Sequence, residues 1–150
     1  TNRPNVRLHL LGPLQSNKAS DAVKLFDIIH SLDREKIARV LSSEMQKQGK
    51  NIPCFIQVNI GDESQKSGVA VCDVEAFYQT CINEYGLHII GLMCIPPADE
   101  NPQPYFKKLK DMADVLGLDN VSMGMSGDYE TAILCGATHV RIGTSLFGKR

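Results

Sequence analysis

The run PCFIQVNI, Pro53–Ile60, is followed first by a segment of helical period, Val71–Tyr85, and then by a second apolar run, LHIIGLMCI, Leu87–Ile95. Two apolar, β-branched runs on either side of an amphipathic segment are typical of a parallel βα unit. Most of the apolar runs in the chain are hydrophobic on both faces. This pattern is expected of strands that helices cover on one side and a barrel core covers on the other.

The same alternation extends outward from this unit in both directions. The predicted strands are Val6–Gly12, Ile28–Leu32, Pro53–Ile60, Leu87–Ile95, Asn120–Met123 and His139–Gly143. The predicted helices are Ser16–Phe26, Arg34–Gln48, Val71–Tyr85, Pro104–Leu116 and Asp128–Cys135. Asp33 is predicted to cap the start of the second helix, and glycines at 49, 86 and 117 are predicted to end three of the helices.

The fold class is therefore α/β, and residues 1–150 are expected to form a single domain because no linker divides them. Two parallel architectures fit the alternation: a closed barrel and an open, doubly wound sheet. Periodicity alone does not separate them. A closed barrel of this kind has eight strands, whereas six are predicted here, so the barrel would be incomplete.

Composition excludes several classes of protein. Sixteen basic and seventeen acidic residues give a formal net charge of −1, so no general field attracts nucleic acid or an anionic membrane. The longest apolar runs fall short of a membrane span, and no signal peptide is recognised. Five scattered cysteines without a CxxC pair are typical of a reduced cytoplasm, which is the expected location.

In either architecture ligands bind at the carboxyl ends of the strands, so the residues that follow each strand are candidate site residues. The segment Ser122–Asp128 passes from a strand into a helix through small residues. Its glycines allow a ligand to approach the backbone, and the Ser126 hydroxyl with nearby N–H groups can donate to phosphate. Met125 and Gly127 flank that serine. The alternative is a plain strand-to-helix turn in which Ser126 is the N-cap.

The segment Arg141–Gly148 is the second candidate, because it again ends a strand with a glycine followed by hydroxyl residues. Gly143 and Thr144 can offer N–H groups to the same phosphate, and phosphate sites after the last two strands recur in this barrel. If Arg141 points into the barrel, its charge requires a ligand or a carboxylate, since an isolated buried charge is costly. A solvated or salt-bridged arginine is the alternative.

Other polar segments give weaker signals. Lys18, after the first strand, and the loop Ser64–Gly68 are interpreted as solvated, with a phosphate or substrate contact as the alternative. His30, His88 and His139 lie in strand runs and are interpreted as hydrogen-bonded core residues. Since no nucleophile elbow, zinc-protease, dinucleotide or Walker motif occurs, the residues alone predict a phosphate-binding βα domain of unknown chemistry.

These stretches together resemble the pyridoxal phosphate homeostasis protein family, which is related to the N-terminal barrel of alanine racemase. The order and spacing of the matching segments agree from end to end. They are HLLGPLQSNK (9–18), QVNI (57–60) leading to KSG (66–68), GLM (91–93), IP (95–96), SMGMSGD (122–128), and VRIGT (140–144) through FG (147–148).

The resemblance implies an incomplete (β/α)₈ barrel of the TIM type with pyridoxal 5′-phosphate (PLP) as cofactor. It implies that Ser126, Gly143 and Thr144 bind the phosphate, with Met125 and Gly127 beside them. It also implies that Arg141 faces the pyridine nitrogen. A cation at that nitrogen discourages its protonation and weakens the ring as an electron sink, which suits carrying the cofactor better than carbanion chemistry.

In this family the Schiff-base lysine lies on the first strand, whereas this chain matches from the third strand to the eighth. No lysine here is assigned that role. The expected function is a noncatalytic carrier or buffer of PLP in vitamin B6 and amino-acid homeostasis, with apo PLP enzymes as partners and no nucleic acid or membrane. The alternatives are a racemase-like or decarboxylase enzyme and an inactive fragment. Unpaired edge strands also predict self-association of this polypeptide.

Overall fold

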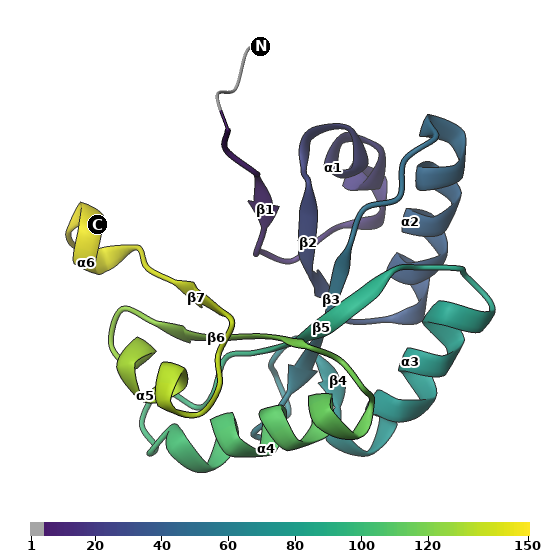
Figure 1. Cartoon of the computed structure of the whole chain (residues 1–150). Coiled ribbons are helices and arrows are strands. Elements are labelled where there is room, and N and C mark those ends of the chain that lie inside the picture. Colours follow the sequence, from purple (N-terminus) through teal and green to yellow (C-terminus); the bar gives the residue numbers. More distant parts are fainter. Residues whose placement is uncertain (1–4) are drawn as a thin grey trace.

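The computed structural model describes residues 5–150, which form one seven-stranded parallel sheet (Figure 1). The strand order is β1-β2-β3-β5-β6-β7, and β4 pairs with β3. The strands are β1 (His9–Leu10), β2 (Ile28–Leu32), β3 (Cys54–Asn59), β4 (Val69–Ala70), β5 (Ile89–Cys94), β6 (Asn120–Met125) and β7 (His139–Arg141). Every predicted strand is present, but β1 is much shorter than the predicted Val6–Gly12.

Helices connect most of the consecutive strands, and a loop connects β3 to β4. The helices are α1 (Ala19–Leu25), α2 (Glu35–Gln48), α3 (Val74–Asn83), α4 (Gln103–Val115), α5 (Tyr129–Leu134) and α6 (Thr144–Phe147), with 3₁₀ turns η1 (Ser16–Lys18) and η2 (Val71–Asp73). The predicted helices are confirmed, and their ends differ by a few residues. Strand β4 and helix α6 were not predicted, because each is too short for its residues to show a hydrophobic period.

Left-handed glycines end the helices as predicted, whereas the predicted helix start was wrong by one residue. Gly49 has φ +64°, Gly86 +60° and Gly117 +70°, which a residue with a Cβ adopts only with strain. The N-cap of α2 is Arg34, not Asp33. The Asp33 carboxylate instead accepts a hydrogen bond of 2.7 Å from the Arg34 guanidinium, so it does not serve the helix N–H groups.

Curvature of the sheet decides between the two predicted architectures. His9 on β1 and His139 on β7 stand at opposite edges of the sheet, yet their ring centroids are 6.0 Å apart. The sheet therefore curls until its two edges approach each other across its concave face. Helices α1 to α5 all lie on the convex side (Figure 1), whereas a doubly wound sheet carries helices on both faces. The fold is an incomplete (β/α) barrel.

Two hydrophobic layers hold this shape. The large outer layer joins helices to strands and includes Ile37, Leu41, Phe106 and Leu109, all fully buried. Burial of such a side chain stabilises the fold by about 1.5–3 kcal/mol. The smaller inner layer consists of Ile28, Phe55 and Met93, with Ile90 packed against it. Polar side chains, among them His30, Ser122 and Arg141, lie beside this inner layer on the concave face, and this is where the candidate site begins.

Candidate cofactor site

The structure brings the two predicted phosphate segments together. One follows β6 and the other follows β7, two neighbouring parallel strands that end at the same edge. The Ser126 hydroxyl oxygen accepts hydrogen bonds from the backbone N–H groups of Gly143, at 3.3 Å, and Ser145, at 3.2 Å. Thr144 lies between these two donors. Sequence reasoning missed Ser145, whose place in an Arg-Ile-Gly-Thr-Ser run gave no signal separate from that of Thr144.

Ser126 lies in the turn between β6 and α5, as the alternative predicted, but it is not the N-cap of that helix. The N-cap of α5 is Asp128, whose carboxylate accepts the N–H of Met125 at 2.7 Å. This leaves the Ser126 hydroxyl available for the β7–α6 turn. The side chain of Met125 is exposed, and a Cβ at Gly127 would meet nothing within 4 Å, so both residues border open space.

The glycine that the local fold requires is Gly124. Its φ is +97°, and a Cβ there would lie 2.6 Å from the Cβ of Ala132 on α5. Gly124 therefore allows α5 to pack closely on β6, which makes it a packing residue. Only Gly127 of the two glycines leaves room for a ligand to approach the backbone.

Arg141 points from β7 onto the concave face and has two hydrogen-bond partners. Its guanidinium donates to the hydroxyl of Ser122 at 2.7 Å and to the backbone carbonyl of Cys94 at 2.8 Å. No carboxylate within residues 5–150 forms an ion pair with it, contrary to the salt-bridged alternative. Burial lowers the pKa of Arg141, and the nearby Cys94 and Asp128 oppose that effect. A half-buried cation with no ion-paired carboxylate among residues 5–150 suits a site that receives an anionic or electron-rich ligand.

A chain of polar contacts leads from Arg141 across the concave face. Ser122 Oγ lies 2.9 Å from His30 Nδ1, and His30 Nε2 lies 2.9 Å from His9 Nδ1. The His30 ring stacks on Phe55 with centroids 4.2 Å apart. The interpretation of His30 as a hydrogen-bonded core residue is confirmed. His88 is exposed and lies just before β5, so its interpretation as a core residue was wrong.

The histidines of this face are held in their neutral form. Burial lowers the pKa of His30 to about 3, and the charges of His9, His139 and Arg141 contribute in the same direction. The pKa values of His9 and His139 are also lowered, again chiefly by burial. At neutral pH the half-buried Arg141 is thus surrounded by uncharged rings.

A cavity of about 700 Å³ adjoins the β7–α6 turn and is lined by Gly143, Thr144, Phe147, Gly148, Lys149 and Arg150. Two cationic side chains and backbone N–H donors thus border one space beside Ser126. This donor set fits a phosphate group, which binds through such N–H, hydroxyl and cationic groups.

The weaker candidates, Lys18 and the loop Ser64–Gly68, line two cavities other than the one at the β7–α6 turn. Lys66 and Ser67 line a smaller cavity, about 280 Å³, with Gln57, Asn59 and the Gly12–Pro13 turn. Lys66 also forms an ion pair of 3.0 Å with Glu63. Lys18 is exposed and lines another pocket, over α1, so its interpretation as a solvated residue agrees with the structure.

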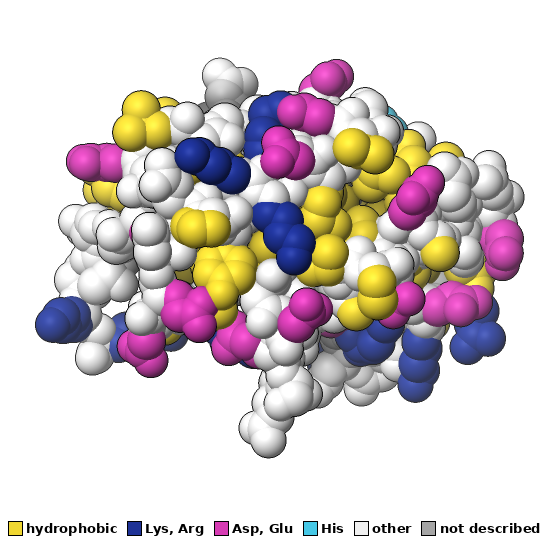
Figure 2. Space-filling model, turned by 90° about the horizontal axis from the view of Figure 1, so that it is seen from below, with side chains coloured by type: hydrophobic (Ala, Val, Ile, Leu, Met, Phe, Trp, Pro, Cys, Tyr) yellow, Lys and Arg dark blue, Asp and Glu magenta, His cyan; other side chains and the backbone are white. Residues whose placement is uncertain are grey.

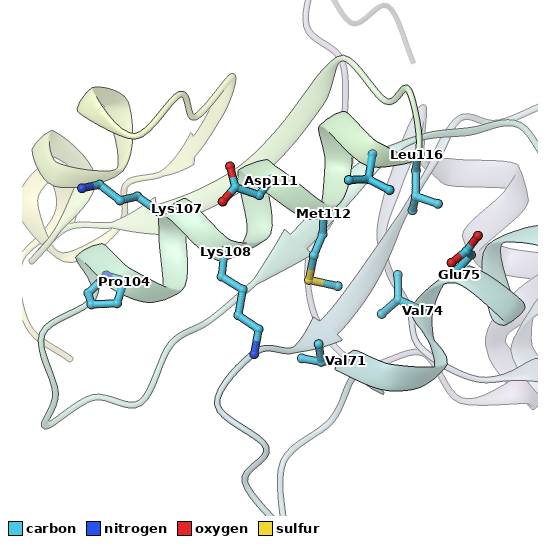
Figure 3. A pocket seen from close by; sticks show the side chains of 10 residues that line it. Val71, Val74, Glu75, Pro104, Lys107, Lys108, Asp111, Met112 and Leu116 are labelled. Atoms are coloured by element: carbon cyan, nitrogen blue, oxygen red, sulfur yellow. The ribbon is translucent and has the colours of Figure 1, made fainter.

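A separate apolar groove of about 510 Å³ lies between α3 and α4 on the convex side (Figure 3). Val71, Val74, Met112 and Leu116 form its apolar lining, and lysine and acidic side chains border it. Figure 2 shows hydrophobic side chains among charged ones on the face seen from below. The groove is lined by α3, α4 and the η2 turn after β4, and by no residue of the two segments that follow β6 and β7, so it is not the candidate cofactor site.

Three further properties concern residues 5–150. No helix in this part of the chain is long and apolar enough to cross a membrane. No group of histidine, cysteine and acidic residues within it is arranged to hold a metal ion. All five cysteines are free thiols, and burial raises the pKa of Cys54 and Cys94 to about 12, in agreement with their interpretation as small hydrophobic residues.

The comparisons with known proteins give a consistent result. The model of the alanine racemase N-terminal domain matches residues 2–150. A pyridoxal phosphate homeostasis protein of Aquifex aeolicus is 40% identical over 151 residues, which cover 95% of this chain and 66% of the relative. A Pseudomonas aeruginosa protein of the same name is 43% identical over 147 residues, which cover 95% and 64%.

A solved structure is similar as well. PipY of Synechococcus elongatus, solved without PLP, superposes with a TM-score of 0.90 at 35% identity, over 97% of this chain and 73% of PipY. The structure of PipY with PLP bound gives a TM-score of 0.88. This chain spans 64 to 66% of the length of the two curated relatives. It belongs to the alanine racemase N-terminal domain family, in which its similar relatives are pyridoxal phosphate homeostasis proteins.

Proposed function

We propose that residues 1–150 form a single partial barrel domain that binds PLP noncovalently and serves as a noncatalytic carrier or buffer of this cofactor. The observation that carries the proposal is the meeting of two strand ends. Two backbone N–H groups converge on the Ser126 hydroxyl, and Arg141 stands on the neighbouring strand with no carboxylate partner within residues 5–150. One end of this arrangement suits a phosphate and the other suits an aromatic nitrogen.

The phosphate half of the proposed site consists of Ser126, Gly143 and Thr144, with Met125 and Gly127 at its border. The N–H groups of Gly143 and Ser145 already point at one oxygen atom, that of Ser126. A phosphate oxygen is a stronger acceptor than a hydroxyl, so it would compete for these N–H donors. The Ser126 O–H, which neither of the two bonds uses, is a further donor for the phosphate. Lys149 and Arg150 border the adjoining cavity and add local positive charge.

Arg141 constitutes the ring half of the proposed site. A guanidinium only donates hydrogen bonds, so opposite a pyridine nitrogen it favours the unprotonated form of that nitrogen. When bound, PLP supplies a ring whose power to stabilise a carbanion depends on protonation of this nitrogen. Arg141 would therefore keep the bound cofactor weakly reactive, as a carrier requires.

The relatives support the proposal through their names alone, since they are called pyridoxal phosphate homeostasis proteins and PipY has been solved with PLP bound. A carrier delivers its cofactor to other proteins, and we propose apo PLP enzymes as the proteins that receive it. The five free thiols support the cytoplasm as the place where the chain acts. An amino-acid racemase on the same barrel is the second candidate, favoured by the matching family model.

Titration of the 150-residue protein with PLP, followed by absorbance, tests the proposal. We expect saturable binding that leaves no mass adduct after borohydride reduction, because no lysine here is assigned the Schiff-base role. Ser126→Ala should weaken binding about fivefold to tenfold, as loss of a hydrogen bond to an anion does. Ser43→Ala, at an exposed position of helix α2, is the control. Racemisation of a free amino acid would instead favour the enzyme.

A further inference from the structure

We propose that Ser122, His30 and His9 form a hydrogen-bonded relay that positions Arg141 for the cofactor ring. The inference rests on the proposed function for what Arg141 contacts. The relay itself is a property of the protein without any ligand. It assigns a role to two histidines and a serine that are otherwise only buried or half-buried polar residues of the barrel interior.

The relay joins four strands in one line. Arg141 comes from β7, Ser122 from β6, His30 from β2 and His9 from β1, and each successive pair lies within 2.9 Å. Ser122 and His30 are almost completely buried, at 0% and 1% exposed, so water cannot replace their partners. Side chains that are 92 positions apart in the chain, such as His30 and Ser122, meet here only because the sheet curls.

The direction of each proton follows from the chemistry of Arg141. A guanidinium has only donors, so Ser122 Oγ must accept from it. The buried Ser122 hydroxyl then needs an acceptor for its own proton, and among residues 5–150 its remaining partner is His30 Nδ1. His30 must therefore carry its proton on Nε2, from which it donates to His9 Nδ1.

A proton added to His30 would break this order. His30 Nδ1 would become a donor, so Ser122 would receive two donors while its own proton lost its acceptor. The groups that face His30 are His9 from β1, Phe55 from β3, and His139 and Arg141 from β7. None of them is an anion. Burial and these neighbours lower the pKa of His30 to about 3, so the ordered form persists at neutral pH.

The ordered relay holds one terminal nitrogen of the Arg141 guanidinium in place through Ser122. Ser122 holds one terminal nitrogen and the Cys94 carbonyl holds the other. The group has more N–H donors than these two bonds use, so its remaining donors can face a ligand. Ser122 and His30 are positioning residues, since they act on the cofactor only through Arg141.

Long-range ¹H–¹⁵N spectra of the histidine rings, recorded without PLP, test the relay by itself. At pH 6 we expect His30 to be neutral with its proton on Nε2, and to show no titration above about pH 4. Ser122→Ala should abolish this pattern. Ser31→Ala is the matched control, because Ser31 neighbours His30 on β2 and its buried hydroxyl has no hydrogen-bond partner among the described residues. A proton on Nδ1 in the unaltered protein would overturn the relay.

PLP titration of variants then tests positioning. We expect Ser122→Ala to weaken binding about tenfold, and Ser31→Ala to leave it within about twofold. His30→Phe keeps the ring on Phe55 but removes the relay, so it should resemble Ser122→Ala. His30→Asn offers an amide oxygen near the place of Nδ1 and should restore most of the affinity. Thermal melts check that each variant is folded.

The two proposals fail in different ways. Failure of the unaltered protein to bind PLP would refute the proposed function, and the histidine spectra would still decide whether the relay exists. If the unaltered protein binds PLP while Ser122→Ala and Ser31→Ala have equal affinities, the positioning role is refuted and the carrier function stands.

Discussion

Among single residues, Arg141 contributes most to the ring half of the proposed site. The resemblance predicted that it faces the ring of the cofactor, and the structure places it on the concave face with a hydroxyl and a carbonyl as partners. Its partners could not be predicted, because Ser122 and Cys94 lie on two other strands whose register the sequence does not specify. Ser126 was predicted from its place between glycines, but its bonds to Gly143 and Ser145 depend on two adjacent turns.

The geometry of the guanidinium at position 141 should matter as much as its charge. Arg141→Lys keeps a cation but cannot bond Ser122 and Cys94 at once from a rigid fork. We expect PLP affinity to fall about tenfold in an absorbance titration. Arg39→Lys, at an exposed position of α2, should leave the affinity unchanged. Equal PLP affinities of the two variants would show that the geometry of the Arg141 guanidinium does not contribute to PLP binding.

The neutral histidines should make folding sensitive to acid. The pKa of His30 is about 3 in the folded chain against 6.5 for an exposed histidine, so the unfolded chain binds a proton more readily. The contribution of neutral His30 to the free energy of unfolding is therefore fully present above pH 6.5. It is lost as the pH falls from 6.5 toward 3, by at most about 1.4 kcal/mol per pH unit for one group. His9 and His139, whose pKa values are also lowered, act in the same direction.

Urea unfolding at pH 7, 6 and 5 measures this effect. In the unaltered protein the free energy of unfolding should fall as the pH is lowered from 7 to 5. In His30→Asn this fall should be smaller. His88→Asn removes an exposed histidine instead and should preserve the slope. A slope that is the same in all three proteins would refute the assignment to His30.

At the scale of elements, the sequence predicted the βα order because long strands and amphipathic helices each repeat a period over many residues. Two elements were not predicted from the sequence. Strand β4 has two residues and α6 has four, so neither shows a period. Strand β1 was predicted too long, since Val6 and Leu11 supply an apolar pattern but are exposed in the structure. Local composition cannot distinguish an apolar residue in a paired strand from one that has no neighbouring strand to pair with.

Contact between β5 and β6 depends on Gly91, which belongs to a segment that matches the family but was not predicted to be a packing residue. A Cβ on Gly91 would lie 2.1 Å from the backbone oxygen of Asn120 and 2.8 Å from the Phe55 ring. Gly91→Ala should therefore lower the free energy of unfolding by about 2 to 3 kcal/mol, as overpacking in a dense core does. Gly12→Ala, where a Cβ meets nothing within 4 Å, is the control for thermal or urea unfolding. Equal stabilities would mean that the strands separate at little cost.

At the scale of the whole molecule, the sequence left a closed barrel and an open sheet as alternatives. Curvature decided between them, through the approach of His9 to His139 across the concave face. That approach brings the first and last strands of the sheet near each other without pairing them, since β1 pairs with β2 and β7 pairs with β6. Edges of this kind are ready to pair with another chain.

The 150-residue polypeptide should therefore self-associate. Size-exclusion chromatography with light scattering should give a mass above that of one chain, 16.5 kDa, and the mass should rise with concentration. Lysines introduced at Val6 and Val140, which are exposed apolar positions beside the two edges, should reduce association. A stable monomer over the whole concentration range would contradict this prediction.

The proposed site is tested most directly by amide ¹H–¹⁵N spectra recorded during a titration with PLP and, separately, with pyridoxal, which lacks the phosphate. We expect PLP to shift the amide signals of Ser126, Gly143, Thr144 and Ser145 together in a saturable manner, with pyridoxal at least about tenfold weaker because it offers these donors no anion. Shifts that cluster elsewhere, such as in the groove between α3 and α4, or equal binding of the two compounds, would contradict the proposed site.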